Sequence, residues 1–215
     1  MENSTIRHMY DRFSSLPLFW ELDAWTGRAT ADSPYRSRVI EQLGLTEGSR
    51  VLDVACGTGL NFKLLQKALK GQGLICGIDQ SPKTLHLAKQ HVEKAAYQNV
   101  ELVEIDSQAF SPDAPFDAAL CTFAIEIIPP WRQTIDMMMN AVKPSGRIGF
   151  IGFIPSSRSG FKALNGFMRA ISMPFGGVDL DRTVREYLQQ TCTEIFYEEV
   201  YGGFYYLLVA EKNRD

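Results

Sequence analysis

The sequence of this 215-residue chain predicts an α/β fold with a doubly wound, mostly parallel sheet that ends in an antiparallel hairpin. Two observations predict it. Short apolar runs of strand length alternate with longer stretches in which apolar residues recur at helical spacing, which is the pattern of parallel βαβ units. The last two runs, residues 193–200 and 204–211, are separated by three residues only. So short a loop joins antiparallel strands.

The elements follow in order along the chain. We expect the five parallel strands at residues 50–55, 73–78, 100–105, 116–123 and 147–154. A helix is expected at 60–69, and two further helices begin at Ser81-Pro82 and at Pro129-Pro130, because serine caps exposed amides and proline suits a first helical turn. The string KPSG at 143–146 predicts a turn before the fifth strand, and residues 155–190 are expected to carry two helices.

Composition excludes several classes of protein. Hydrophobic residues make up 45% of the chain and charged residues 22%, as in an ordinary globular domain. With 25 acidic and 22 basic side chains the net charge is −3, which argues against a dedicated nucleic-acid binder. No apolar run is long enough for a transmembrane helix, and the N-terminus has no signal-peptide pattern. We therefore expect a single cytoplasmic domain.

The four cysteines, Cys56, Cys76, Cys121 and Cys192, form no C-x-x-C pair. We interpret all four as free thiols of a reduced compartment, three of them in apolar strands. Their spacing matches no zinc motif, so no metal site is expected.

The sharpest local signal is the loop that follows the first expected strand, DVACGTG at residues 53–59. Gly57 and Gly59 allow a tight turn and a close approach of a ligand to the backbone, and the next helix offers its N-terminal amides. Asp79 closes the second strand, where a carboxylate can accept two hydrogen bonds from a ribose diol. These residues predict a nucleoside ligand over the loop, although the same glycines would also suit a plain tight turn.

Two common nucleotide motifs do not fit this loop. Dinucleotide-binding proteins have a third small residue where this chain has Phe62, and no Gly-Lys-Ser/Thr follows as in a P-loop. A nucleoside without a diphosphate remains. Asp53 would then face an ammonium group of the ligand, or else bond only to the amides of the loop.

The string VLDVACGTG resembles motif I of the class I S-adenosylmethionine (SAM)-dependent methyltransferases, and the resemblance covers residues 49–153. It implies a seven-stranded Rossmann-like sheet, SAM as the cofactor and S-adenosylhomocysteine as the product. Asp79 in GIDQSP matches the acid that binds the ribose, and Asp106 in VEIDSQAF the acid that reaches the adenine. Ala55 stands where the family often has glycine. The cofactor-binding residues implied are Asp53, Ala55, Gly57, Thr58, Gly59, Asp79, Gln80, Asp106, Ser107 and Thr122.

The acceptor side is less well defined. Glu126 interrupts an apolar run after the fourth strand, where it could orient an amine, act as a base or be a surface carboxylate. Tyr10 and Tyr35 are candidate residues of an aromatic N-terminal lid, although that segment could equally be a packed helix. Residues 154–178 carry Arg158, Lys162 and Arg169 without an acid. They suit either peripheral contact with an inner membrane surface or a substrate-capping helix buried against the sheet.

These features suggest one division of the chain: a lid over 1–45, a cofactor-binding core over 49–153, substrate-capping helices over 154–192 and a hairpin over 193–211. The strings CGTGLNFKLL and IPPW resemble bacterial phospholipid N-methyltransferases. The resemblance implies methyl transfer to an amine of a phospholipid headgroup or a similar amphipathic molecule. O-, N- or C-methylation of a soluble metabolite or natural product remains an alternative, as does a SAM-binding regulatory protein without turnover.

Overall fold

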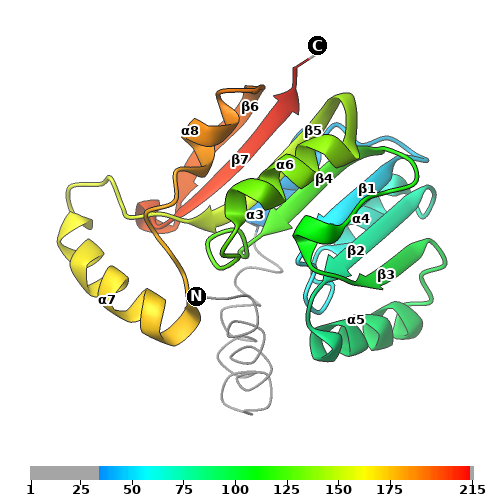
Figure 1. Ribbon diagram of the computed structural model, residues 1–215, viewed down its shortest axis with the longest axis horizontal. Helices are drawn as coiled ribbons and strands as arrows, with labels where there is room; N and C mark the ends of the chain where they lie inside the picture. Colours follow the sequence, from blue (N-terminus) through cyan, green and yellow to red (C-terminus); the bar gives the residue numbers. More distant parts are fainter. Residues whose placement is uncertain (1–33, 214–215) are drawn as a thin grey trace.

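The computed structural model of the chain describes residues 34–213, except for the side chains of residues 171–176. Seven strands form one twisted sheet, with helices on both faces (Figure 1). The strands are β1 (Arg50–Val54), β2 (Leu74–Asp79), β3 (Val100–Glu104), β4 (Phe116–Thr122), β5 (Val142–Phe153), β6 (Cys192–Val200) and β7 (Tyr205–Lys212). Their order is β3-β2-β1-β4-β5-β7-β6.

The sheet confirms the expected fold class. Strands β1 to β5 pair in parallel, whereas β7 lies antiparallel to both β5 and β6. The hairpin therefore inserts its second strand, not its first, beside the parallel sheet. The strand order reverses between β1 and β4, and the carboxyl ends on either side of such a point form the usual ligand crevice of an open α/β sheet.

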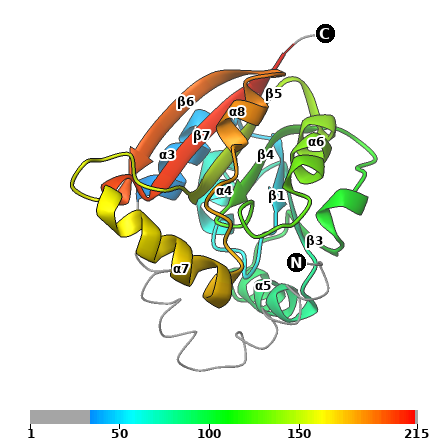
Figure 2. The ribbon, with the colours of Figure 1, turned by 60° about the vertical axis from the view of Figure 1, so that its left-hand side comes forward.

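Helices cover the two faces unequally. The described helices are α3 (Pro34–Gln42), α4 (Phe62–Leu69), α5 (Pro82–Lys94), α6 (Trp131–Ala141), α7 (Asn165–Gly176) and α8 (Val184–Leu188), with short 3₁₀ turns η1 (Ser107–Ala109), η2 (Lys162–Leu164) and η3 (Tyr201–Gly203). Side chains of α6 and α8 share one core cluster, and those of α3, α4 and α5 share the other. Helix α7 stands away from the sheet (Figures 1 and 2).

Local signals explain several helix boundaries. The side chain of Ser81 accepts a hydrogen bond from the amide of Thr84, and Pro82 is the first residue of α5, as the sequence predicts. Apart from β5, the expected ends of the elements lie within two residues of those observed. No helix among residues 34–213 is long and apolar enough to cross a membrane.

The turn expected at residues 143–146 is wrong as a strand boundary. These residues lie inside β5, between Val142, which pairs with Phe116, and Arg147, which pairs with Ala118. The residues between them bulge out of the ladder, with Ser145 at a φ of 61°. The buried Val142 already pairs with β4 before these four residues, and Arg147 pairs with it after them. Proline and glycine therefore mark a bulge within β5 and not its start.

Candidate functional site

The glycine loop lies at the carboxyl end of β1, as expected. Gly57 has a φ of 55° and Gly59 a φ of 81°, both in the left-handed region that favours glycine. A Cβ atom on Gly59 would lie 2.4 Å from the ring of the fully buried Phe62, whereas nothing lies within 4 Å of a Cβ atom on Gly57. The loop is therefore packed below Gly59 and open above Gly57.

Asp79 ties this loop to the end of β2. Its Oδ2 accepts a hydrogen bond from the amide of Gly57 at 2.9 Å, and its Oδ1 accepts bonds from the amide of Ser81 at 2.9 Å and the hydroxyl of Thr84 at 3.3 Å. Burial raises the pKa of Asp79, and these hydrogen bonds oppose the shift. These bonds use three of the about four lone-pair positions of a carboxylate, which leaves room for one further donor from a ligand.

Asp53 lies fully buried below the loop. It accepts hydrogen bonds from the side-chain amide of Asn61, at 2.9 Å to Oδ1 and 3.1 Å to Oδ2. Burial raises its pKa to about 7, against the effects of Asn61 and Arg36. Asp53 thus has a side-chain partner that the sequence did not suggest. Ala55 has a φ of 52°, a conformation that costs an L-residue roughly 1 kcal/mol relative to glycine.

The remaining cofactor candidates lie along the same edge of the sheet. Asp106 caps η1 by accepting a hydrogen bond from the amide of Gln108, and the hydroxyl of Ser107 lies 2.9 Å from that of Thr134 on α6. The Thr122 hydroxyl at the end of β4 accepts bonds from Arg36 and Asn61. Thr58 and Gln80 are partly exposed beside the two aspartates.

The structure also brings in two residues that the sequence argument missed. Asn61 and Arg36 are both buried, at 2% and 5% exposure. Asn61 had a weak local signal, because it comes two residues after Gly59 and directly before α4. Arg36 had none, since it lies in a helix before the first strand.

The three catalytic candidates are not brought together. Glu126 is 1% exposed and accepts a hydrogen bond from the hydroxyl of Tyr206 at 2.8 Å, while its Oε2 has no hydrogen-bond partner among the described residues. Tyr35 on α3 packs on the opposite face of the sheet, in the cluster that also contains Tyr205. Tyr10 lies outside the described residues.

Burial raises the pKa of Glu126 to about 7, against the hydrogen bond from Tyr206. The segment around Glu126 also holds the chain that leaves α7. The backbone carbonyl oxygen of Glu126 accepts a hydrogen bond from the amide of Asp179 at 2.9 Å. The side chain of Arg182 donates to the carbonyl oxygens of Ile125 and Ile128.

An aromatic cluster surrounds the end of β4 on the α3 face. The rings of Phe123, Phe153 and Tyr205 lie 5.1 to 5.3 Å apart between centroids, and Tyr201 stacks on Tyr205 at 4.8 Å. Phe123 has a φ of 57°, so the chain turns sharply directly after Thr122. The cluster forms a partly exposed apolar surface at the carboxyl ends of β4 and β5.

Residues 157–170 are not buried against the sheet, so the expectation of a buried helix is wrong for this part of 154–178. Phe161, Leu164 and Phe167 are 42%, 47% and 63% exposed. The hydrogen bonds that hold this segment lie at its ends, such as those between Ser156 and the side chain of Asn165. Residues 154–178 contain no acidic residue, but Arg169 forms an ion pair at 2.5 Å with Asp181, which follows this segment.

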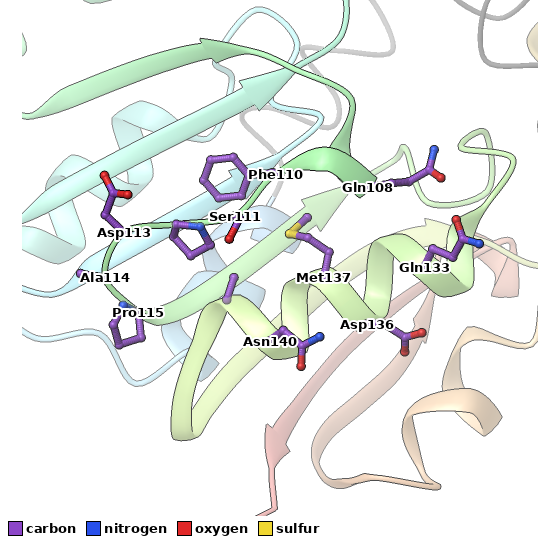
Figure 3. A pocket seen from close by; sticks show the side chains of 12 residues that line it. Gln108, Phe110, Ser111, Asp113, Ala114, Pro115, Gln133, Asp136, Met137 and Asn140 are labelled. Carbon is purple, nitrogen blue, oxygen red and sulfur yellow. The ribbon is translucent and has the colours of Figure 1, made fainter.

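A hollow of about 480 Å³ lies elsewhere, between α6 and the connection from β3 to β4 (Figure 3). Its polar lining includes Gln108, Gln133, Asp136 and Asn140. Asp136 also accepts a hydrogen bond from the hydroxyl of Tyr187 at 2.6 Å. No residue of the glycine loop lines this hollow, but its Gln108 donates a hydrogen bond to the cofactor candidate Asp106 at 3.0 Å.

Comparisons with known proteins agree with this geometry. A methyltransferase domain family matches residues 51–146. A demethylmenaquinone methyltransferase of Staphylococcus aureus (strain JH9) is 28% identical over 189 residues, which cover 86% of this chain and 73% of the relative.

Solved structures share the fold at lower identity. A SAM-dependent methyltransferase from Aquifex aeolicus superposes with a TM-score of 0.66 at 21% identity, over 82% of this chain and 89% of that one. A geranyl diphosphate C-methyltransferase from Streptomyces coelicolor A3(2), solved with S-adenosyl-L-homocysteine, gives 0.68 at 13% identity, over 84% and 76%.

Proposed function

We propose that this chain, in which residues 51–146 match a methyltransferase domain family, acts as a SAM-dependent methyltransferase on a membrane-borne lipid, with the amine of a phospholipid headgroup as the first candidate acceptor. SAM supplies an activated methyl group on a sulfonium. The enzyme's part in such a displacement is to align the two reactants and exclude water.

The loop fits this cofactor on two observations. The space above Gly57 is open, and Asp79 can accept one further hydrogen bond, as from a ribose hydroxyl. We propose that Asp79 holds the ribose and that Asp106, with Ser107, reaches the adenine. The same proposal places Ala55, Gly57, Thr58 and Gly59 under the methionine and ribose, with Gln80 and Thr122 at the sides. Residues 49–153 then bind the cofactor and residues 154–192 cap the acceptor.

The observation that carries the lipid proposal is an exposed apolar rim, defined as Phe161, Leu164, Phe167 and Tyr201. All four are 42% exposed or more. Phe161 lies 3.5 Å from the position of a Cβ atom on Gly202, next to Tyr201, so η2 and η3 are neighbours. The rim follows the carboxyl end of β5, and this is the sheet edge that carries the glycine loop. Exposed apolar groups beside Arg158 and Lys162 suit an anionic lipid surface.

The test is a methyl-transfer assay with anionic liposomes that contain phosphatidylethanolamine. Purified protein is incubated with methyl-labelled SAM, and the lipid extract and the aqueous phase are counted separately. We expect label in the lipid headgroup. Absence of lipid label, in a protein shown to bind SAM, would contradict the proposal and favour a soluble acceptor.

Replacement of Phe161, Leu164 and Phe167 together by serine is expected to lower methylation of liposomes at least tenfold, since each apolar side chain in a membrane contributes roughly 1.5–3 kcal/mol. SAM affinity should stay unchanged, because none of the three residues belongs to the loop. The matched control is Ile195→Ser, which removes a 38% exposed side chain from β6. Equal methylation rates for the triple variant and this control would contradict the proposal that the apolar rim contacts the membrane.

A second acceptor is favoured by the relative that matches 86% of this chain, a demethylmenaquinone methyltransferase. A quinone with an isoprenoid tail is also a membrane lipid, so the apolar rim would serve it equally. Liposomes that contain demethylmenaquinone in place of phosphatidylethanolamine separate the two acceptors. Label on the quinone alone would show that the acceptor atom is a ring carbon and not an amine nitrogen.

We also propose that Glu126 accepts a proton from, or orients, the acceptor amine, through the Oε2 that has no hydrogen-bond partner among the described residues. A base must be ionised, so methyl transfer should rise with pH up to the pKa of about 7. Glu126→Gln should lower kcat about 100-fold and abolish this rise. Tyr206→Phe, which removes only the hydrogen bond to Oε1, is the control and should keep most of the rate.

The same variant tests stability with a defined sign. A carboxyl whose pKa is raised from 4.5 to about 7 stabilises the fold when protonated, and that contribution is lost as pH rises through this range, by roughly 3 kcal/mol in all. Glu126→Gln should therefore unfold with less dependence on pH. A normal kcat together with this flatter profile would show that Glu126 is a structural acid.

A further inference from the structure

A buried arginine on α3 contacts the residue before α4 and the end of β4. Arg36 lies on α3, and its helical spacing with Val39 and Ile40 places it on the apolar face of that helix. It is 5% exposed. A guanidinium on such a face is costly unless it is paired with acceptors, so its partners carry information about its role.

Two of these partners belong to the cofactor edge of the sheet. The Nη1 of Arg36 donates to Oδ1 of Asn61 at 2.5 Å and to the hydroxyl of Thr122 at 2.7 Å. The Nδ2 of Asn61 in turn donates to Asp53 and lies 3.1 Å from the same hydroxyl. We call these four residues the Arg36 network. It joins α3, the end of β1, the start of α4 and the end of β4.

The donors and acceptors fix one orientation. Arginine can only donate, so the oxygen of the Asn61 amide must face it. The nitrogen of that amide then faces Asp53, and Asp53 is the residue from which the glycine loop begins. Arg36 therefore selects the rotamer of Asn61 that gives Asp53 its hydrogen bonds.

Charge adds a second link. Burial disfavours the ionised form of Asp53, and Arg36 is the positive group that favours it. The other titratable groups that face Asp53 are Asp79 and the thiols of Cys56, Cys76 and Cys121, all of which are acids. The guanidinium also lies 5.3 Å from the ring centroid of Phe123, in the aromatic cluster.

We propose that Arg36 is a positioning residue that holds Asn61 and Thr122 in the arrangement to which SAM binds, and so links the glycine loop to the end of β4. It acts through these partners and touches no cofactor. The link is independent of the acceptor, so it holds for an amine, a ring carbon or a soluble substrate alike.

The test is SAM binding by isothermal titration calorimetry, which needs no acceptor. Arg36→Gln is expected to weaken SAM binding about tenfold at pH 7.5, because the Asn61 amide loses the donor that orients it. Arg38→Gln is the matched control, since Arg38 is on the same helix but pairs at the surface with Glu198. It should bind SAM as the wild-type protein does.

The pH profile separates positioning from loss of packing. SAM is a cation, so its affinity should rise as Asp53 ionises, with a midpoint near the pKa of about 7. Arg36→Gln should move this midpoint to higher pH, because the favourable charge is lost. Arg36→Lys keeps the charge and should restore the midpoint while recovering only part of the affinity. An unshifted midpoint in Arg36→Gln would overturn the proposal.

A double-mutant cycle with Asn61→Ala tests whether Arg36 acts through Asn61. We expect Arg36→Gln to add little to the loss that Asn61→Ala already causes. Fully additive losses would overturn the proposal. Circular dichroism and thermal melts check folding, and if Arg36→Gln fails to fold, the cycle is measured with Arg36→Lys, for which the same two outcomes apply.

Discussion

Replacement of Asp79 by asparagine is expected to weaken SAM binding roughly 100-fold, or about 3 kcal/mol. Asparagine offers one acceptor oxygen where the carboxylate offers two, so the variant cannot both accept from Gly57 and meet a ribose diol. The loss thus combines the ligand contact with the contact that holds the loop. Titration calorimetry with SAM measures it, and Asp79→Ala should be at least as weak.

Folding should survive this change. Burial raises the pKa of Asp79, so the ionised carboxylate is itself a cost to the folded state, and the neutral amide avoids that cost. The thermal midpoint of Asp79→Asn should therefore fall only modestly, because the neutral side chain offsets part of the hydrogen bond lost to Gly57 or Ser81. Glu101→Gln, at an exposed position of the adjacent strand β3, is the control that removes a carboxylate without touching the loop. Equal SAM affinity in Asp79→Asn and Glu101→Gln would contradict the ribose assignment.

The change Gly59→Ala should be the most destabilising substitution in the loop. The new methyl group would lie 2.4 Å from two ring carbons of Phe62, at a φ of 81°. Left-handed backbone costs an alanine roughly 1–2 kcal/mol, and an overpacked core roughly 1–3 kcal/mol more. A loss of about 2–5 kcal/mol is a large share of the stability of a domain this size. Urea unfolding followed by circular dichroism measures it.

Gly57→Ala provides the contrast. No atom of the described residues lies within 4 Å of its new methyl group, so the variant should lose only about 1 kcal/mol of stability for its left-handed backbone. The methyl group would instead occupy the space above the loop, and SAM affinity should fall at least tenfold. A second comparison relieves the clash directly: the combination Gly59→Ala with Phe62→Leu should recover part of the stability that Gly59→Ala loses. Near-equal stability of Gly57→Ala and Gly59→Ala would show that Phe62 does not close the loop from below.

Much of the fold followed from short stretches of sequence, because the forces that make each element act within a few residues. Short apolar runs of strand length predicted all seven strands, and the three residues between the last two strands predicted their antiparallel pairing. Ser81 and Pro82 marked the start of α5. The turn chemistry at residues 143–146 misled, since proline and glycine serve a bulge as readily as a strand end.

Some features of the candidate site could also be predicted from the sequence, and others could not. The glycine loop and Asp79 were predictable, because a tight turn and a carboxylate at a strand end are local signals. The exposure of the apolar rim was not, since a helical apolar stripe looks the same whether it faces a sheet or solvent. Nor could the sequence place Glu126 and Tyr35 on opposite faces of the sheet, because that depends on where the chain turns after Thr122.

The sequence by itself therefore predicted the fold class, the glycine loop and the carboxylate of Asp79 beside it. Only the tertiary structure decided what supports them. Arg36 is 25 residues from Asn61 and 86 from Thr122 along the chain, yet one nitrogen atom binds both. No periodicity or turn rule spans such separations. These contacts exist because the sheet brings the ends of β1 and β4 side by side and α3 packs its apolar face, with its single buried arginine, across them.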